Sequence, residues 1–436
     1  MLVTLASRVA PPGSGKALRA LRSRRGVERR FAEWARKERD TGRPLLWVHA
    51  PSVGEGLQAL PLLKLFRARR SNAQIAYTYY SPSAERFAAS VGADFADYLP
   101  FDTRQQVDAA LDSLRPAVIA FSKVDVWPTL VERAAYRGIK LALLSATMPE
   151  SSRRNSGIAR LILADAYHAL DAIGAIDDAD AVRLIEAGVR SDRITVTGDT
   201  RYDQVWERAQ AWSPGSVGPV AAASPEKPTL VAGSTWPADE QHLLSAWSRV
   251  VYERPGVRLI IAPHEVTPKH LDAIETWARE ADISLSRLGE PDSAHSDVVL
   301  VDQYGALGDL YALAHFAYVG GGFHDAGLHS LLEPAAFGAP VIIGPRHTDN
   351  RDARLLIAAG AAFRCESGRE ISSRIVRWID SPEAREKAGH AAREVVRSEL
   401  GAAERSYAIV EGLLGAATAH GGTDGAVTTE SAEHAE

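Results

Sequence analysis

The chain has 436 residues, 46% hydrophobic and 24% charged, a composition and length that allow two buried cores. A net charge of −5 argues against a globally basic nucleic-acid-binding protein, so no nucleic-acid partner is expected. The single cysteine, Cys365, excludes an internal disulfide framework and fits a reducing, cytoplasmic setting. No run of 18 apolar residues occurs, and Met1–Ala10 lacks the pattern of a signal peptide.

The N-terminal region is locally basic. Residues 16–39 contain ten Lys or Arg and three Glu, a local net charge of +7. Leu18, Leu21, Phe31 and Trp34 are interleaved with these charges. Two interpretations remain open: the segment lies on an anionic surface, or it forms a solvated helix whose apolar side packs on the fold.

Short apolar runs alternate with longer amphipathic stretches along most of the chain, which predicts parallel sheets covered by helices on both faces. The expected strands lie at 45–50, 75–79, 118–121, 140–145, 194–197, 229–232, 258–262, 298–301, 316–319 and 341–343. We therefore expect an α/β protein with two Rossmann-like, doubly wound domains facing a cleft. The expected divisions are a basic segment at 1–40, a first domain at 41–212, a linker at 213–228, a second domain at 229–415 and a disordered tail at 416–436.

Candidate functional residues follow strands, because ligands of open α/β sheets bind at the carboxyl ends of the strands. Glu55 lies between two glycines after the first strand, at the expected start of a helix, where a carboxylate can serve as a general base or simply favour the helix dipole. Lys123 and Arg201 follow two other strands and bring positive charge to the same edge.

The second half contains the run Gly320-Gly321-Gly322 after a strand, which predicts a phosphate-binding loop or, alternatively, close packing of strand and helix. Downstream, Ser330 is a plausible helix N-cap, and Glu333 can accept hydrogen bonds from ribose hydroxyls. Two further strand ends supply polar groups to this edge, namely Ser234 and Thr235 after one strand and Pro263 and His264 after the next.

Metal-binding signals are weak. The thirteen histidines are scattered, and none shows an HExxH or comparable ligand spacing. We therefore expect no required metal and no cofactor.

Taken together, these clusters resemble the Kdo transferase family, enzymes that add 3-deoxy-D-manno-oct-2-ulosonic acid (Kdo) to a lipid A precursor. The resemblance runs from about Arg25 to about Arg397. It rests on ordered matches at consistent spacing: WVHAPSVGEG, YLPFD, DVWP, GDTRYD, GSTWPADE, APHE, the GGG…HSLLEP loop and GPRHTDN. Family members have the GT-B architecture, with the nucleotide sugar bound by the C-terminal domain and the acceptor by the N-terminal domain.

The resemblance implies specific roles. Glu55 matches the family's general base, which deprotonates the acceptor hydroxyl that attacks CMP-Kdo with inversion and without a metal. Arg201 falls where most members have a lysine that stabilises the leaving phosphate, and Lys123 is implied to contact a donor or acceptor phosphate. The implied CMP-binding positions are Ser234, Thr235, Pro263, His264, Tyr304, Gly305, Ala306, Gly321, Gly322, Ser330, Leu331, Leu332 and Glu333.

Several positions depart from the commonest family pattern. Lys123 and Asp125 replace the two acids of Glu-Thr-Glu, His264 replaces an arginine, Tyr304-Gly305-Ala306 replaces Met-Gly-Glu, and Ser330 replaces an asparagine. These changes together resemble a divergent branch of the same family, so they are interpreted as a rebuilt, working site.

The implied acceptor is an anionic lipid A precursor, lipid IVA, at the cytoplasmic face of the inner membrane, in lipopolysaccharide biosynthesis. Because the usual hydrophobic anchor is reduced here, peripheral attachment through residues 16–39 is expected. Two alternatives remain: another GT-B enzyme that uses a UDP-sugar, as a transferase or an epimerase, or a non-catalytic nucleotide-sugar-binding relative.

Overall fold

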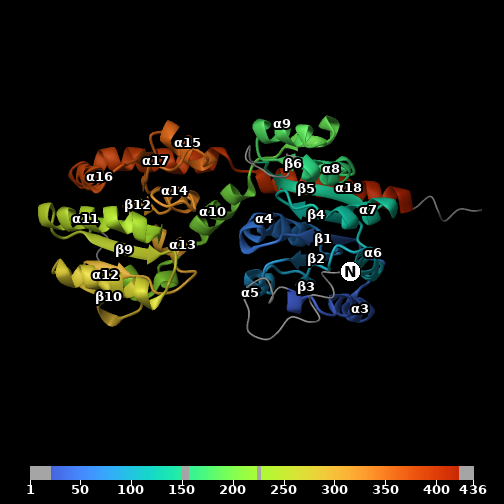
Figure 1. Ribbon diagram of the computed structural model, residues 1–436, viewed down its shortest axis with the longest axis horizontal. Helices are drawn as coiled ribbons and strands as arrows, with labels where there is room; N and C mark the ends of the chain where they lie inside the picture. Colours follow the sequence, from blue (N-terminus) through green and yellow to red (C-terminus); the bar gives the residue numbers. More distant parts are fainter. Residues whose placement is uncertain (1–20, 149–156, 223–226, 422–436) are drawn as a thin grey trace, which may run out of the picture. The chain divides into compact units, whose positions relative to one another are not determined.

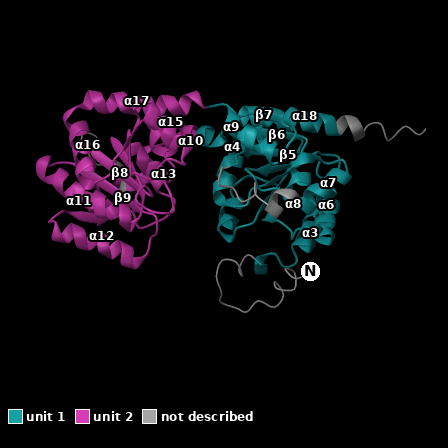
Figure 2. Ribbon diagram, turned by 45° about the horizontal axis from the view of Figure 1, so that its top comes forward, with its two compact units in different colours: residues 1–204, 400–436 teal, residues 205–399 magenta. Residues whose placement is uncertain are grey.

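The computed structural model describes residues 21–148, 157–222 and 227–421. The chain forms two compact units, residues 1–204 with 400–436 and residues 205–399 (Figure 2). Each unit is built on a seven-stranded sheet whose neighbouring strands are all parallel (Figure 1). The prediction of an α/β protein with two Rossmann-like domains is confirmed.

The first sheet has the strand order β3-β2-β1-β4-β5-β6-β7. Its strands are β1 (Leu45–His49), β2 (Gln74–Tyr79), β3 (Phe95–Tyr98), β4 (Val118–Ser122), β5 (Lys140–Ala146), β6 (Ala172–Ala175) and β7 (Ile194–Val196). The helices of this unit are α3 (Val27–Glu38), α4 (Val53–Arg69), α5 (Glu85–Ala88), α6 (Arg104–Leu114), α7 (Pro128–Tyr136), α8 (Gly157–His168), α9 (Asp178–Glu186) and α18 (Ala402–Gly421). Helix α10 (Thr200–Ala211) begins in this unit and ends in the second.

The second sheet has the order β10-β11-β9-β8-β12-β13-β14. Its strands are β8 (Thr229–Thr235), β9 (Arg258–Pro263), β10 (Leu285–Arg287), β11 (Val298–Leu300), β12 (Phe316–Val319), β13 (Val341–Ile343) and β14 (Ala362–Arg364). The helices are α11 (Pro237–Glu253), α12 (Pro268–Glu280), α13 (Leu307–Leu310), α14 (Leu332–Ala336), α15 (Arg351–Ala358), α16 (Gly368–Asp380) and α17 (Pro382–Ser398). The central strands β8, β9 and β12 are almost wholly buried, as expected of strands covered on both faces.

The basic helix α3 turns its aromatic side chains toward the domain. Phe31 is fully buried, with its ring 4.7 Å from that of Phe95 and 6.0 Å from that of Trp47. Trp34 also lies against Phe95, at 5.0 Å. Of the two interpretations of this segment, the structure therefore supports apolar packing on the fold for Phe31 and Trp34. Leu18 lies outside the described residues.

The division of the chain differs from the expected domain boundaries. Helix α18 packs against the first unit, where Val410 and Leu414 are buried in its core, so residues 400–415 do not belong to the second domain and 416–421 are helical. Residues 422–436 lie outside the described part. The expected linker contains short 3-10 turns at Pro214–Ala222, in which Val217 and Val220 are buried. Buried apolar residues thus make these segments parts of the domains.

Among the described residues, no helix combines the length and apolar character that crossing a bilayer requires.

Candidate active site

Glu55 and Lys123 meet at the carboxyl edge of the first sheet. Glu55 lies in the first turn of α4, directly after β1, and its carboxylate accepts a hydrogen bond from the hydroxyl of Ser52. The Nζ of Lys123, the residue after β4, lies 3.6 Å from Glu55 Oε1. The Glu55 side chain is 19% exposed, so the carboxylate is oriented on both sides and still reachable from solvent.

The backbone of Lys123 is strained. Its φ is +70°, in the left-handed region that non-glycine residues rarely adopt, and its N–H donates to the carbonyl of Leu144 at 2.8 Å. Left-handed non-glycine residues typically cost 1–3 kcal/mol and cluster at functional sites. This conformation therefore strengthens the case that Lys123 is positioned for a role beside Glu55.

Arg201 is held by a buried carboxylate. Asp199 is 1% exposed and accepts from the backbone N–H of Arg201 at 2.9 Å and from its Nε at 2.8 Å. Asp199 also lies 3.4 Å from Nε2 of Gln58, one helical turn after Glu55 on α4. The Arg201 side chain remains 35% exposed, and the contact with Asp199 fixes the direction of its guanidinium.

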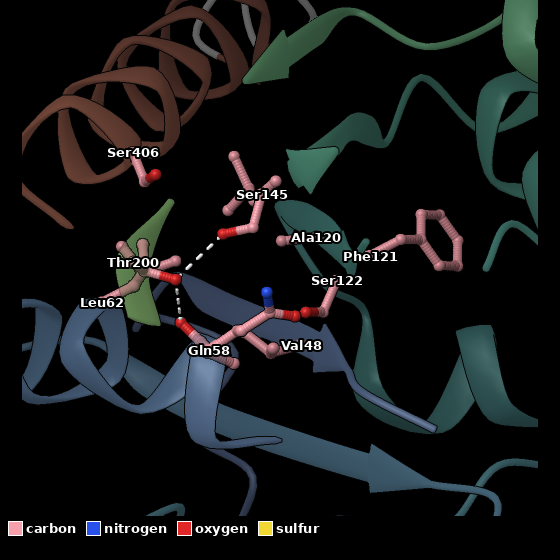
Figure 3. Close-up of a pocket in the computed structure, with 11 residues that line it drawn as sticks. Val48, Gln58, Leu62, Ala120, Phe121, Ser122, Ser145, Thr200 and Ser406 are labelled. Carbon is pink, nitrogen blue, oxygen red and sulfur yellow. Dashed lines mark hydrogen bonds between the residues drawn. The ribbon is translucent and has the colours of Figure 1, made fainter. Parts of the chain in front are cut away.

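A small, mostly apolar cavity lies near these residues, lined by α4, β1, β4, β5, α10 and α18 (Figure 3). The hydroxyl of Thr200 donates to the carbonyl of Gln58 at 2.6 Å and lies 2.9 Å from that of Ser145 (Figure 3). The hydroxyl of Ser406 lines the same cavity and is buried without a partner. At about 10 Å³ the cavity has room for one water and none for a substrate. The hydrogen bond from Thr200 to Gln58 holds the start of α10 against α4.

His49 is the last residue of β1, and its side chain is buried and neutral. Burial lowers its pKa to about 3, and the charge of Arg24 acts in the same direction. The indole N–H of Trp127 donates to His49 Nε2 at 3.2 Å, which leaves Nδ1 to carry the proton toward the carbonyl of Thr78 at 3.1 Å. His49 therefore supports the loop after β1 and is unsuited to acid–base chemistry near neutral pH.

The glycine-rich loop of the second domain is organised around Asp239. This fully buried carboxylate accepts from the backbone N–H groups of Gly321 at 2.8 Å and Phe323 at 3.2 Å. It also accepts from the hydroxyl of Tyr318 at 3.0 Å and the N–H of Trp236 at 3.0 Å. The prediction that Gly321 offers its N–H to a phosphate is corrected, because an internal carboxylate already occupies that donor.

The glycines of this loop permit close backbone packing. A Cβ on Gly320 would lie 2.2 Å from the carbonyl oxygen of Ser234, and one on Gly321 would lie 2.0 Å from that of Gly327. A Cβ on Gly322 would lie 2.4 Å from the backbone nitrogen of Gly344. The structure thus supports the packing interpretation of the three glycines.

Other predicted donor-binding residues are used internally. The hydroxyl of Thr235 is fully buried and donates to Glu240 at 2.7 Å, so it is not free for a ligand. Leu331 and Leu332 are buried core residues, which leaves only their backbone to a ligand. Ser330 Oγ accepts from the N–H of Leu332 at 3.4 Å, although the cap position of the short helix α14 is Leu331.

The remaining positions lie at the carboxyl edge of the second sheet. Pro263 ends β9, and Ser234 adopts a left-handed φ of +54° within β8. Tyr304 is 75% exposed, and its hydroxyl accepts from the N–H of Val266 at 3.1 Å. Gly305 has a φ of +94°, and Ala306 is the N-cap of α13.

Glu333 faces a cation that the sequence did not single out. Arg208 Nη1 lies 3.7 Å from Glu333 Oε1, and its Nε lies 3.0 Å from Asp309. Burial raises the pKa of Glu333, while the charge of Arg208 opposes the increase. A carboxylate so placed has the chemistry to accept hydrogen bonds from ligand hydroxyls.

A stacked aromatic cluster surrounds Trp236. Its ring lies 4.1 Å from that of His324 and 4.4 Å from that of His264. The Trp236 indole donates to His329 Nε2 at 3.1 Å. Burial, followed by the charge of His264, lowers the pKa of His329 to about 4, so His329 is neutral at pH 7. His264 therefore belongs to a preformed cluster beside the glycine loop.

A polar hollow of about 540 Å³ opens between the loops that follow β12 and β13. His324 lies on one side of it, and the other side includes Arg346, His347 and Asn350. Nδ1 of His347 is buried without a partner in the described structure. A hollow of this size and lining can hold a sugar or a nucleotide.

Sequence reasoning missed the residues that organise these sites. Asp199, Trp236 and Asp239 lie inside motifs that were noticed, GDTRYD and GSTWPADE, but only the structure shows what their side chains bind. Within the described residues, no group of three or more His, Cys, Asp or Glu side chains is placed to hold a metal ion.

Two helix-covered parallel sheets with polar groups at their carboxyl ends define a protein of two Rossmann-like domains, as in GT-B glycosyltransferases and related epimerases. The fold is similar to a putative UDP-N-acetylglucosamine 2-epimerase from Listeria monocytogenes, with a TM-score of 0.61, 14% identity and coverage of 85% of this chain and 96% of that chain. It is equally similar to UDP-GlcNAc 2-epimerase from Neisseria meningitidis, with a TM-score of 0.61, 16% identity and coverage of 85% and 100%.

Sequence comparison identifies the family. Residues 24–204 match the family model described as 3-deoxy-D-manno-octulosonic-acid transferase (kdotransferase). The chain is 30% identical to the 3-deoxy-D-manno-octulosonic acid transferase of Bordetella pertussis over 85% of this chain and 87% of that protein. It is 25% identical to the enzyme of the same name from Haemophilus influenzae, with the same coverage. The chain therefore belongs to the 3-deoxy-D-manno-octulosonic acid transferase family.

Proposed function

We propose that this protein is an inverting, metal-independent glycosyltransferase that moves Kdo from CMP-Kdo to lipid IVA, a lipid A precursor. Family membership supports Kdo transfer. The observation that carries the mechanism is the placement of Glu55 at the carboxyl edge of the first sheet, oriented by Ser52 and Lys123.

In the proposed reaction, the Glu55 carboxylate takes the proton from an acceptor hydroxyl. The hydroxyl oxygen forms a bond to the anomeric C2 of Kdo, and the bond from C2 to the CMP phosphate oxygen breaks. CMP leaves with the bonding electron pair. Attack from the face opposite the leaving group inverts the configuration at C2.

Cationic side chains are proposed to stabilise the negative charge that develops on the leaving phosphate. Arg201 has the role of stabilising this phosphate, since Asp199 fixes its guanidinium while part of the side chain stays exposed. Lys123 is proposed to have one of two roles. Its ammonium contacts a substrate phosphate, or it orients the carboxylate of Glu55, whose Oε1 lies 3.6 Å from Nζ. A fixed cation stabilises charge in the transition state without reorganising.

The donor is proposed to bind at the carboxyl edge of the second sheet. His264 and the exposed Tyr304 are proposed to contact the CMP group, and Glu333 to accept from the ribose hydroxyls. The 540 Å³ hollow beside His324 provides the adjoining space. The backbone groups of Ser330–Glu333 complete the proposed donor site.

Nucleotide preference separates this proposal from a UDP-sugar enzyme. The full chain is expected to bind CMP at least ~10-fold more tightly than UDP, because cytosine and uracil present opposite hydrogen-bonding groups at position 4 of the base. Calorimetry with both nucleotides measures the ratio. Equal affinities, or a preference for UDP, would contradict the donor assignment and favour the epimerase-like alternative.

The protein is also proposed to attach peripherally to the cytoplasmic face of the inner membrane. Because Phe31 and Trp34 pack on the first domain and Arg24 is buried, the attachment rests on the exposed basic side chains of this segment, which are Arg25, Arg29, Arg36 and Lys37, at ~1 kcal/mol for each Lys or Arg near an anionic surface. Raising the salt concentration is expected to release the protein from anionic vesicles. Binding that persists unchanged in high salt would refute charge-based attachment.

A further inference from the structure

A second polar hollow, distant in sequence from the proposed donor residues, lies where β14 meets α16. Its volume is about 330 Å³. Arg364, at the end of β14, lines it together with Arg369, Arg374 and Arg377 from α16. All three α16 arginines line the hollow, although they are spaced by five and three residues along the helix.

The charges of this hollow are poorly compensated. Arg369, Arg374 and Arg377 have no ion-pair partner in the described structure. The one carboxylate in the lining, Glu370, already accepts from the N–H of Glu366 at 3.0 Å and lies 3.5 Å from the hydroxyl of Ser367. Arg364 pairs with Glu366. An excess of positive charge therefore remains on the α16 side.

Arg374 is held in place by aromatic rings. Its guanidinium carbon lies 4.2 Å from the centre of the Phe363 ring and 5.9 Å from that of Trp378. Burial lowers the pKa of Arg374, and the neighbouring charge of Arg377 acts in the same direction. A guanidinium fixed on an aromatic face loses little side-chain entropy when it binds an anion.

A hollow elsewhere in the same domain provides a contrast. The hollow of about 400 Å³ beside α12 is lined by two arginines and two glutamates. There, Arg287 Nη2 lies 2.8 Å from Glu275. The α16 hollow has four arginines and one glutamate, so cations are in excess there and not in the hollow beside α12.

We propose that the α16 hollow is a binding site for a phosphate-bearing anion, separate from the transferase site. Clustered guanidinium groups recognise phosphate oxygens through paired, charge-assisted hydrogen bonds. The same chemistry is offered by a soluble phosphate compound and by the phosphate headgroup of a lipid. The inference does not depend on the proposed transferase function.

The test uses the full chain with the double substitution R369Q/R377Q. Both arginines are exposed and make no ion pair with any residue that the structure describes, so the variant is expected to fold. The matched control is R249Q/R279Q, which removes two exposed arginines of the same domain that do not line the hollow. Binding is measured by calorimetry with pyrophosphate in saturating CMP, and by flotation with vesicles of equal parts phosphatidylcholine and phosphatidic acid.

We expect R369Q/R377Q to weaken binding of at least one probe by ~10-fold or more relative to the control. Weaker binding of pyrophosphate by the variant identifies a site open to soluble phosphates. Weaker binding of vesicles alone identifies a site for a lipid headgroup. If wild type, control and variant bind both probes alike, or bind neither, the proposal is overturned.

Discussion

Glu55→Gln is expected to lower the turnover of Kdo transfer by ~10²–10⁴-fold while leaving CMP affinity unchanged. Glutamine keeps the size of the side chain but cannot take the proton from the acceptor hydroxyl. The Ser52 hydroxyl and the Lys123 ammonium would then orient a neutral amide. Single-turnover rates at saturating donor and acceptor measure the effect on the chemical step.

Glu85→Gln is the matched control for this variant. Glu85 also lies in the first turn of a helix, α5, that follows a strand of the first sheet, but it is exposed. Its substitution is expected to leave transfer within about twofold of wild type, since no general-base role depends on it. A Glu55→Gln enzyme that retains more than a tenth of the wild-type rate would show that another group accepts the proton.

Asp239→Ala is expected to destabilise the second domain by about 3 kcal/mol or more. Asp239 is fully buried and accepts from four donors, which belong to Trp236, Tyr318, Gly321 and Phe323. Each buried donor left unsatisfied costs about 1–3 kcal/mol. Urea unfolding measures the global loss, and hydrogen exchange of the amides at 320–323 measures the local opening of the loop.

Asp239→Asn and Glu253→Ala complete this comparison. Asparagine keeps the shape of the side chain but replaces one acceptor oxygen with a donor. The stability of Asp239→Asn is therefore expected to lie between those of wild type and Asp239→Ala. Glu253 is an exposed residue at the end of the same helix, α11, and its removal is expected to change stability by at most ~0.5 kcal/mol. If Asp239→Ala lowers the free energy of unfolding by less than 1 kcal/mol, water replaces the carboxylate. Asp239 would then not be the residue that holds the loop in place.

Most central strands could be predicted from the sequence, as could the edge strand β7, but the other three edge strands could not. Strands such as β1, β4, β9 and β12 are continuous apolar runs because they are buried on both faces. The strands missed were β3, β6, β10 and β14, each of three or four residues, and three of them are edge strands. Short edge strands bury fewer side chains, so their sequences carry a weaker pattern.

The sequence predicts which residues of the candidate site can carry chemistry better than it predicts which atoms those residues contact. Placing Glu55, Lys123 and Arg201 at one sheet edge needed only the rule that functional residues follow parallel strands. By contrast, Asp239 binds an N–H group 82 residues away in the chain, and nothing in the local sequence of the glycine loop reveals that partner. Loop glycines permit phosphate binding and tight packing alike, and only the neighbouring side chains decide between them.

The N-terminal segment and the C-terminal helix illustrate the same limit. Basic residues around Phe31 and Trp34 fit either a membrane surface or a packed amphipathic helix, and the choice depends on the apolar surface of Phe95 and Trp47 nearby. Helix α18 returns to the first domain, where the backbone N–H groups of Gly401 and Ala403 donate to Asp203. Such long-range contacts leave no periodic signal in the sequence.

The most direct test of the central claim is transfer from freshly generated CMP-Kdo to a tetra-acylated lipid A precursor, with EDTA present. We expect the wild-type protein to transfer Kdo and the Glu55→Gln variant to lose transfer, which would establish the reaction, the base and independence from metal together. A folded wild-type protein that transfers no Kdo in a membrane-mimicking detergent, with or without added divalent metal, would contradict the proposed function.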